Sequence, residues 1–425
     1  MKFDRGSFII IITSMLMALG SSAKADENWE IVSTVPNNLY AIWGIADDDI
    51  VAAGENGIIL YYDGASWDQI SSGTPQTLYA LWGDISGAVV AAGAGGTIVS
   101  LENTAFSSMQ SPTILNIYGL WGAGSGIFGV GQNGLTIFFN GSSWQSLDSP
   151  TGFILTGIWG SDSDNIFAVG EAGTIIHFDG ETWEEVADVP TRKNLNSVWG
   201  SSASDIFAVG DNGTIIHYDG NTWESMVSPT TLNLECLWGS AEDDVFASGY
   251  ASTVLHYDGE SWEELSMDPS ADVDIHAVWG SYSGRVYFSG DSGIIMLYER
   301  DDAIQPTVIA TDPEQGETGV STSTLVRFLF PEEMSSETLN TSTMTLTSGS
   351  LSIPGTVAYN DRIATFTPAD DLEFSTQYTA TVNTGAEDLS GNGLKQAYSC
   401  TFTTETSPGS GDTSGGGCFI GISCM

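Results

Sequence analysis

The stretch Trp199–Trp223, WGSSASDIFAVGDNGTIIHYDGNTW, decides the fold. It starts with Trp-Gly, passes through the apolar run DIFAVG, turns at DNG and continues through TIIHYDG to a second tryptophan. Short apolar runs separated by Gly, Asn and Asp are typical of β-strands joined by tight turns. The stretch therefore predicts a set of antiparallel strands connected by hairpins.

The Trp-Gly dipeptide recurs along the chain at intervals of 38 to 41 residues. Four short strands in a period of this length are typical of a β-propeller blade. The dipeptide begins at Trp43, Trp82, Trp121, Trp159, Trp199, Trp238 and Trp279. We therefore predict an all-β chain with a seven-bladed propeller over residues 26–302.

The two ends of the repeat array predict that the propeller is closed. The last repeat lacks the second tryptophan, whereas Trp29 precedes the first Trp-Gly by 14 residues. Trp67 precedes the next Trp-Gly by a similar 15 residues. The N-terminal segment is therefore expected to supply the fourth strand of the last blade, which would remove exposed strand edges.

The copy Trp199–Trp223 resembles the BNR-like and photosystem II assembly factor-like repeats of exported bacterial proteins. More broadly, it is similar to the WD/YVTN/BNR-like propeller superfamily. The resemblance covers residues 26–302 of 425 and implies the propeller fold. The run Asp219–Trp223, DGNTW, is one residue shorter than the Asp-box of sialidases, so the resemblance implies no sialidase activity.

The chain is strongly acidic, with 10 Lys and Arg against 54 Asp and Glu. A basic start, an apolar run and the cleavage site Ala23-Lys24-Ala25 predict a secretory signal over residues 1–25. Its removal takes away three basic residues and one acidic residue and leaves 7 and 53. Because nucleic acids and anionic membranes attract basic surfaces, this balance argues against both as partners. It suits solubility, a divalent cation or a cationic partner.

No apolar run of about 18 residues follows the signal, so no transmembrane helix is predicted. We expect an exported bacterial protein that is secreted, periplasmic or displayed on the cell surface, and that is a monomer.

His217 and Asp219 lie two apart on a predicted strand and could form a catalytic pair or a metal site. The repeat argues against both, because the column of His217 accepts side chains of many kinds. It also holds Tyr61, Ser100, Phe138, His177, His256 and Leu297. Such a column is expected for packing, and Asp219 before a glycine predicts a hairpin turn.

A second column precedes the second strand of several repeats and contains Asp49, Asn165, Asp205 and Asp244. This column could bind calcium through carboxylates such as Asp243 and Asp244. An Asx turn in a solvated loop explains the column without a metal, and we favour that interpretation and expect no cofactor.

The predicted propeller contains few basic residues, namely Arg192, Lys193, Arg285 and Arg300. An arginine cradle for a substrate carboxylate is therefore not expected. No phosphate-binding loop, His-Glu metalloprotease motif or nucleophile elbow is present either, so we assign no catalytic residue.

The best binding-site candidate is a variable column in the innermost predicted strands. It consists of Tyr40, Tyr79, Tyr118, Thr156, Asn196, Glu235 and His276. We expect it to line a mouth of the central channel and to bind an unknown protein or glycan; the alternative is that it only fills the channel. The neighbouring column holds small residues, which indicates that Cys236 is a buried packing residue.

Residues 303–406 have a different composition, without tryptophan and with many Thr and Ser. Their short alternating strands predict a β-sandwich. The pieces PEQGETGV, VRFLFPEEM, ATFTPADDL and DLSGNGL resemble the SbsA-type bacterial Ig-like domain, which implies a spacer or adhesive module. Residues 407–425 predict a Gly/Ser linker and a tail in which Cys418 and Cys424 could form a disulfide or be modified.

Taken together, the sequence predicts a non-catalytic binding, adhesion or interaction scaffold. Two alternatives stay open. One is a glycan-active hydrolase or lyase that uses carboxylates at the channel mouth, such as Glu235. The other is an assembly factor for an exported complex.

Overall fold

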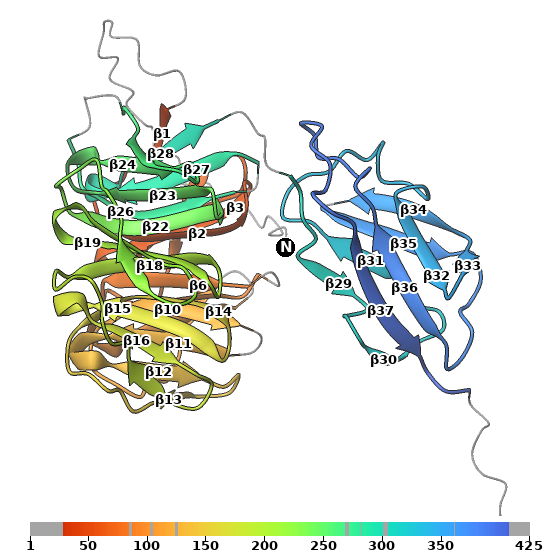
Figure 1. Cartoon of the computed structure of the whole chain (residues 1–425), viewed down its shortest axis with the longest axis horizontal. Coiled ribbons are helices and arrows are strands. Elements are labelled where there is room, and N and C mark those ends of the chain that lie inside the picture. The colour runs from red at the N-terminus through yellow and green to blue at the C-terminus, as the bar shows by residue number, and fades with distance from the viewer. Residues whose placement is uncertain are drawn as a thin grey trace, which may run out of the picture. The chain divides into compact units, whose positions relative to one another are not determined.

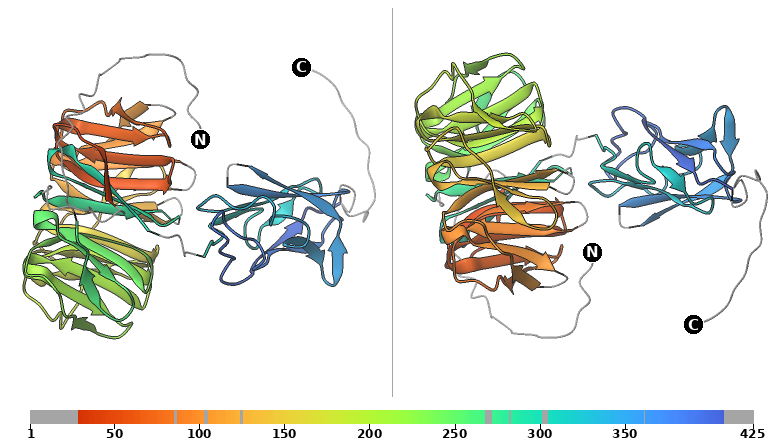
Figure 2. Two further views of the ribbon diagram at one scale, coloured as in Figure 1. Left: turned by 90° about the horizontal axis from the view of Figure 1, so that it is seen from above. Right: turned by 90° about the horizontal axis from the view of Figure 1, so that it is seen from below.

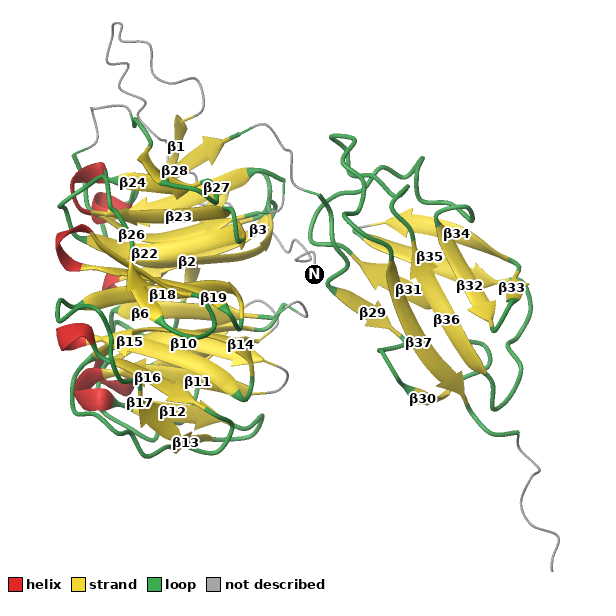
Figure 3. Ribbon diagram, in the orientation of Figure 1, coloured by secondary structure: helices red, strands yellow, loops and turns green. Residues whose placement is uncertain are grey.

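The computed structural model describes residues 29–407 except for 85–86, 103–104, 124–125, 268–271, 282, 301–304 and 361. The chain divides into two compact units, Met1–Asp301 and Asp302–Met425. Both are built from β-strands, and the helical turns of the first unit gather at one end of its strands (Figure 3). The predicted signal segment 1–25 and the tail cysteines Cys418 and Cys424 lie outside the described residues.

The first unit contains seven four-stranded antiparallel sheets, which we number in chain order (Figure 1). The first sheet contains β2 (Leu39–Ala46), β3 (Asp49–Gly54), β4 (Ile58–Tyr62) and β5 (Trp67–Ser71). The second contains β6 (Leu78–Gly83), β7 (Val89–Gly93), β8 (Ile98–Glu102) and β9 (Ala105–Ser108). The third contains β10 (Ile117–Ala123), β11 (Gly126–Gly131), β12 (Thr136–Phe139) and β13 (Trp144–Ser146).

The later sheets repeat the same order of strands. The fourth contains β14 (Leu155–Asp162), β15 (Asn165–Gly170), β16 (Ile175–Phe178) and β17 (Trp183–Glu185). The fifth contains β18 (Leu195–Ser202), β19 (Asp205–Gly210), β20 (Thr214–Tyr218) and β21 (Trp223–Ser225). The sixth contains β22 (Leu234–Ala241), β23 (Asp244–Gly249), β24 (Val254–Tyr257) and β25 (Trp262–Glu264).

The seventh sheet combines the two ends of the unit. It contains β26 (Ile275–Gly280), β27 (Arg285–Gly290), β28 (Ile295–Glu299) and the N-terminal strand β1 (Trp29–Ser33). Strand β1 is antiparallel to β28, with Trp29 opposite Tyr298, which is the pairing that the position of Trp29 predicts.

The second strand of each sheet is buried on both faces, because the neighbouring sheets cover it on either side (Figure 2). This explains why DIFAVG is an unbroken apolar run rather than an alternating one: its five residues after Asp205 are all buried. Hydrophobic clusters accordingly join adjacent sheets; one, for example, contains Phe167 of the fourth sheet and Trp223 of the fifth.

The Trp-Gly repeat is explained by contacts between neighbouring sheets. A Cβ atom on Gly200 would lie only 2.8 Å from the ring of Trp159 in the preceding sheet, so a glycine is needed there. The same contact joins Trp43 to Gly83, Trp82 to Gly122, Trp121 to Gly160, Trp199 to Gly239, Trp238 to Gly280 and Trp279 to Gly44. The last pair joins the seventh sheet to the first.

A three-residue 3-10 turn follows the second strand of every sheet. These turns are η1 (Glu55–Gly57), η2 (Ala94–Gly96), η3 (Gln132–Gly134), η4 (Glu171–Gly173), η5 (Asp211–Gly213), η6 (Tyr250–Ser252) and η7 (Asp291–Gly293). Their central residue has a positive φ, as at Asn212 with 54°, a conformation that asparagine tolerates well.

The second unit consists of two sheets. One contains β29 (Ala310–Asp312), β31 (Val326–Leu329), β35 (Ile363–Pro368) and β34 (Gly355–Asn360). The other contains β30 (Thr318–Val320), β37 (Tyr398–Thr404), β36 (Gln377–Val382), β32 (Met344–Ser348) and β33 (Leu351–Ile353). A core that includes Phe328, Phe366 and Phe402 lies between them. Cys400 is a buried free thiol in this unit.

Candidate functional site

The variable column occupies the second residue of each innermost strand, and all seven side chains are half-buried. The register between the innermost and the second strand shifts at this residue in every sheet, as between Leu195 and Ser197 on either side of Asn196. A bulge changes the direction of a side chain without ending the strand. The repeat therefore presents seven different side chains in equivalent positions.

Four members of the column form a continuous aromatic arc across four neighbouring strands. The ring of His276 on β26 lies 5.0 Å from Tyr40, Tyr40 lies 5.6 Å from Tyr79, and Tyr79 lies 5.3 Å from Tyr118, all between ring centroids. Three of the four are tyrosines, which combine an apolar ring with a hydroxyl. The structure thus brings together residues that are more than 150 positions apart in the sequence.

The other three members of the column are polar. Asn196 Nδ2 donates to the carbonyl of Leu234 at 2.9 Å and approaches Glu235 Oε1 at 3.4 Å. Thr156 Oγ1 donates to the carbonyl of Leu195 at 2.7 Å. These bonds connect innermost strands of adjacent sheets, so this side of the column also holds neighbouring strands together.

Glu235 is the one carboxylic acid of the column. Burial raises the pKa of its carboxyl, the charge of His276 lowers it, and the charges of Asp211 and Asp274 raise it again, with a net rise. Burial also raises the pKa of Tyr40 and of Tyr79. The column therefore combines a half-buried carboxyl, an imidazole and three phenols at one end of the strands.

Sequence reasoning missed the residues of the 3-10 turns beside this column. The charge of Glu235 is the main cause of a raised pKa at Tyr250, the first residue of η6. Tyr40 donates to Glu55 of η1 at 3.3 Å, and His276 Nε2 lies 2.9 Å from Asp291 of η7. The signal was present in the sequence, because acids recur directly after the second strand.

Sequence reasoning also missed a column of Asn and Asp two residues before the variable one. The side chain of each accepts a hydrogen bond from the central turn residue of the preceding sheet, as Asn233 does from Asn212 at 2.8 Å. Asn116, Asn194, Asp274 and Asn38 repeat this bond. For Asn38 the donor is Ser292, so this bond joins the first sheet to the seventh.

His217 and Asp219 have separate hydrogen-bond partners. Asp219 Oδ1 accepts from the backbone N–H groups of Asn221 and Thr222, both within 3.0 Å, which confirms its turn role. The interpretation of His217 as a packing residue was incomplete. Its Nε2 lies 2.6 Å from Asp205 Oδ1, and its ring lies 4.5 Å from that of Phe207.

Three of the four residues in the candidate calcium column lie beside histidines of their own sheets. Asn165 contacts His177, Asp205 contacts His217, and Asp244 contacts His256. Within the residues that the structure describes, no group of three or more His, Cys, Asp or Glu is arranged to hold a metal ion. Asp244 also accepts a hydrogen bond from Arg300.

Cys236 packs in the innermost strand β22, directly after Glu235 of the variable column. It is 8% exposed, and its sulfur lies 2.9 Å from the hydroxyl of Ser248. Burial raises the pKa of its thiol to about 12, so the thiol is neutral and unreactive at physiological pH.

Residues 302–404 match the family described as bacterial Ig-like domain. The second unit is therefore a bacterial Ig-like domain. No curated protein matches the chain. Among the described residues, no helix has the length and apolar character needed to cross a membrane.

Solved β-propellers are similar to the first unit. The WD40 β-propeller domain of Doa1 has 10% identity and a TM-score of 0.56, with 65% of this chain and 98% of that chain covered. YCF48 bound to D1 peptide has 16% identity and a TM-score of 0.55, with 67% and 100% covered. A streptogramin B lyase has 14% identity and a TM-score of 0.56, with 65% and 99% covered. These likenesses show a β-propeller fold.

Proposed function

We propose that this chain is an exported bacterial interaction protein without catalytic activity. A closed seven-bladed propeller carries the binding surface, and the bacterial Ig-like domain acts as a spacer. The binding surface is the channel mouth formed by the variable column and the adjacent 3-10 turns.

Three contacts between the first and seventh sheets support closure. Strand β2 packs beside β26, Trp279 packs against Gly44, and Asn38 accepts from Ser292. The same three contacts join the other neighbouring sheets at most positions, so the seventh-to-first junction is equivalent to the rest. In a closed ring every sheet has a neighbouring sheet on both of its faces.

The observation that carries the function is the aromatic arc from His276 to Tyr118. Tyrosines offer a large contact area at a small cost in side-chain entropy, which suits recognition of a protein partner. The arc is bordered by Glu235, Glu55 and Asp291, so the partner segment that fits is aromatic or apolar with cationic groups. The similar YCF48 structure has a peptide bound, which favours a peptide segment as the ligand here.

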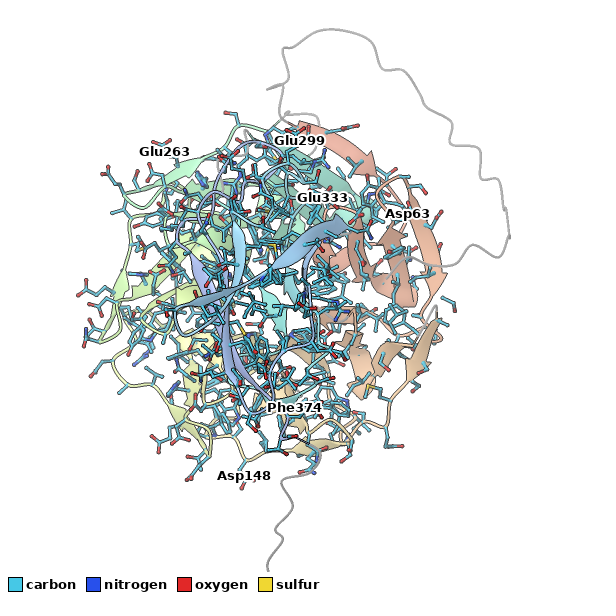
Figure 4. All side chains as sticks on the ribbon, turned by 90° about the vertical axis from the view of Figure 1, so that its right-hand side faces the viewer. Asp63, Asp148, Glu263, Glu299, Glu333 and Phe374 are labelled. Atoms are coloured by element: carbon cyan, nitrogen blue, oxygen red, sulfur yellow. The ribbon has the colours of Figure 1, made fainter. Side chains whose placement is uncertain are left out.

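A comparative pull-down from the native cell envelope tests this function. We expect the wild type to retain a specific protein, and Tyr79→Ala with Tyr118→Ala to lose it. The matched control is Phe374→Ala, which removes an exposed aromatic from the Ig-like domain (Figure 4). Equal retention by wild type, mouth variant and control would contradict a binding role for the mouth.

Export rests on the predicted signal over residues 1–25 and on the bacterial Ig-like domain, a module typical of surface proteins. N-terminal sequencing of the protein from its native cells should show a mature chain that begins at Asp26. A chain that retains residues 1–25 in the cytoplasmic fraction would contradict export.

A second candidate is a glycan-active hydrolase or lyase. Glu235 favours it, because a half-buried carboxyl with a raised pKa beside a histidine suits general acid catalysis. One of the similar propellers is a lyase. Turnover of a glycan or polyuronide by the purified protein, with loss of that turnover in Glu235→Gln, would establish this function in place of a purely binding one.

A further inference from the structure

Three successive junctions between sheets share one set of residue types outside the channel mouth. An Asn or Asp, a Phe and a His come from one sheet, and a Tyr and a Trp come from the next. The three sets are Asn165, Phe167, His177, Tyr218 and Trp223; Asp205, Phe207, His217, Tyr257 and Trp262; and Asp244, Phe246, His256, Tyr298 and Trp29.

The geometry of the three junctions is also similar. The Phe and His rings lie 4.5, 4.5 and 4.6 Å apart, and the Phe and Tyr rings of neighbouring sheets lie 5.8, 5.3 and 6.3 Å apart. The His approaches the Asn or Asp at 2.6, 2.6 and 2.8 Å. A group that fits one junction is therefore expected to fit another with matching charge.

The junction between the sixth and seventh sheets is occupied by a side chain of the protein itself. Arg300 Nη2 donates to Asp244 Oδ2 at 2.7 Å, and Nη1 donates to Oδ1. The guanidinium carbon lies 5.3 Å from the centroid of Phe246. Asp244 thus accepts two bonds from the guanidinium in addition to those from His256 and Ser240.

The junction between the fourth and fifth sheets shows the same set of residues with a cavity. A volume of about 320 Å³ is lined by Asn165, Phe167, His177, Tyr218 and Trp223, with Asp188 also in its wall. Arg300 contacts the residues equivalent to Asn165 and Phe167 at its own junction. A cavity therefore lies two repeats earlier at the position equivalent to that of the guanidinium.

The junction between the fifth and sixth sheets, which we call the Asp205 junction, has the residue types of the Arg300 site. Asp205 accepts from Ser201 at 2.5 Å and from His217 at 2.6 Å, the same two partners as at Asp244. Within the described residues, no arginine contacts Asp205 in the manner of Arg300. The side chain of Asp205 is 19% exposed, so it can be reached from solvent.

We propose that the Asp205 junction binds an arginine side chain of a partner protein, in the way that the neighbouring junction binds Arg300. A carboxylate has about four lone-pair sites, of which Asp205 uses two and Asp244 uses four. A guanidinium matches the remaining pair as a planar fork and stacks on aromatic rings, whereas an ammonium is a compact point charge without that fork. The excess of acidic residues in the chain attracts such a cationic partner.

Calorimetric titration of the full-length protein with the capped peptide acetyl-Gly-Arg-Gly-amide tests the proposal. We expect saturable binding at one site. It should weaken about tenfold or more in Asp205→Asn, because a charged hydrogen bond to arginine is worth about 1.5 kcal/mol or more. The matched control is Asp148→Asn, which removes an identical charge from an exposed position at the outer edge of the third sheet (Figure 4).

Peptides with lysine or citrulline in place of arginine distinguish the contribution of the guanidinium's shape from that of its charge. Lysine at the same position should bind several-fold more weakly, and citrulline, the neutral isostere of arginine, should not bind. Absence of saturable binding, an equal loss in Asp148→Asn, or equal binding of citrulline would overturn the proposal. Free L-arginine that binds tenfold tighter than the peptide would overturn the partner-protein part of it.

Loss of binding in Asp205→Asn should not result from misfolding, and two further variants test the equivalence of the junctions and their independence from the channel mouth. Asn165 occupies the equivalent position and lies 2.6 Å from His177 and 2.7 Å from Ser161, so an asparagine at position 205 is compatible with the fold. Conversely, Asn165→Asp should create a second binding site and raise the stoichiometry from one to two; an unchanged stoichiometry would contradict the equivalence of the junctions. Tyr79→Ala should leave arginine binding intact, because the mouth is a separate site.

Discussion

Individual residues of the variable column differ in chemistry although their backbone positions are the same. Each lies at a bulge near the start of an innermost strand, where the seven sheets converge. Neighbouring positions must be small or apolar because strands pack closely there, as for Cys236. The side chain at the bulge is not restricted to a small or apolar type, so polar and aromatic residues occupy this position without disturbing the core.

Glu235→Gln should raise stability at neutral pH. Burial raises the pKa of Glu235 in the folded chain above its ordinary value of 4.5, although the charge of His276 opposes this. The folded state therefore binds this proton more tightly than the unfolded state, and stability falls as pH rises through the folded pKa. At pH 7 the half-buried carboxylate of Glu235 therefore lowers the stability of the wild type, whereas the neutral Gln of the variant does not.

Thermal unfolding of both proteins at several pH values measures this difference. The two melting temperatures should converge well below the ordinary glutamate pKa of 4.5, where Glu235 is protonated in both states. A variant less stable than the wild type at pH 7 would show that the charge of Glu235 is compensated by His276.

At the scale of elements, strand β1 has the most unusual role, because it completes a sheet whose other strands lie more than 240 residues later. Its indole packs on two rings of that sheet, with Trp29 4.7 Å from Tyr298 and 5.4 Å from Phe288. Strand β1 holds the N-terminal end of the unit to its C-terminal end. Its contribution to stability should therefore exceed what a five-residue strand normally gives.

Trp29→Ala should lower the free energy of unfolding of the first unit by about 2–4 kcal/mol, because a large aromatic contact is lost. Ile31→Ala in the same strand is the matched control. Ile31 is 52% exposed, so its truncation should cost less than about 0.5 kcal/mol. Urea unfolding followed by tryptophan fluorescence and circular dichroism compares them; similar losses in the two variants would contradict the role of the indole.

At the scale of the whole molecule, the junction between the seventh and first sheets decides whether the ring is closed. Gly44→Ala places a Cβ 2.7 Å from the Trp279 ring and should cost about 1–3 kcal/mol through overpacking. Adding Trp279→Leu should recover at least about 1 kcal/mol of that cost, since the two residues are in contact. Gly152→Ala, with no atom within 4 Å of its Cβ, should be neutral.

The two compact units should fold independently. The Ig-like domain has its own core around Phe328, Phe366 and Phe402, and the sheets of the first unit have theirs. Fragments 26–301 and 302–407, expressed separately, should each give a cooperative thermal transition, and their summed circular dichroism spectra should equal that of the chain 26–407. An unfolded 302–407 fragment would contradict this independence.

The sequence alone determined the repeat and much of its internal structure. Trp-Gly spacing, turn residues and the composition change near residue 302 are local signals, because they reflect contacts between sheets that recur at fixed separation. They were sufficient to predict four-stranded units, the pairing of β1 with the last repeat, the turn at Asp219 and the Ig-like second unit.

Only the tertiary structure decided how side chains from different repeats meet. His276 and Tyr40 are at opposite ends of the repeat array, and their 5.0 Å contact follows from the meeting of the seventh and first sheets. Arg300 meets Asp244 by reaching across to the sixth sheet, a contact that no local pattern encodes. Periodicity specifies each unit, whereas the packing of neighbouring units sets which charged and aromatic groups face one another.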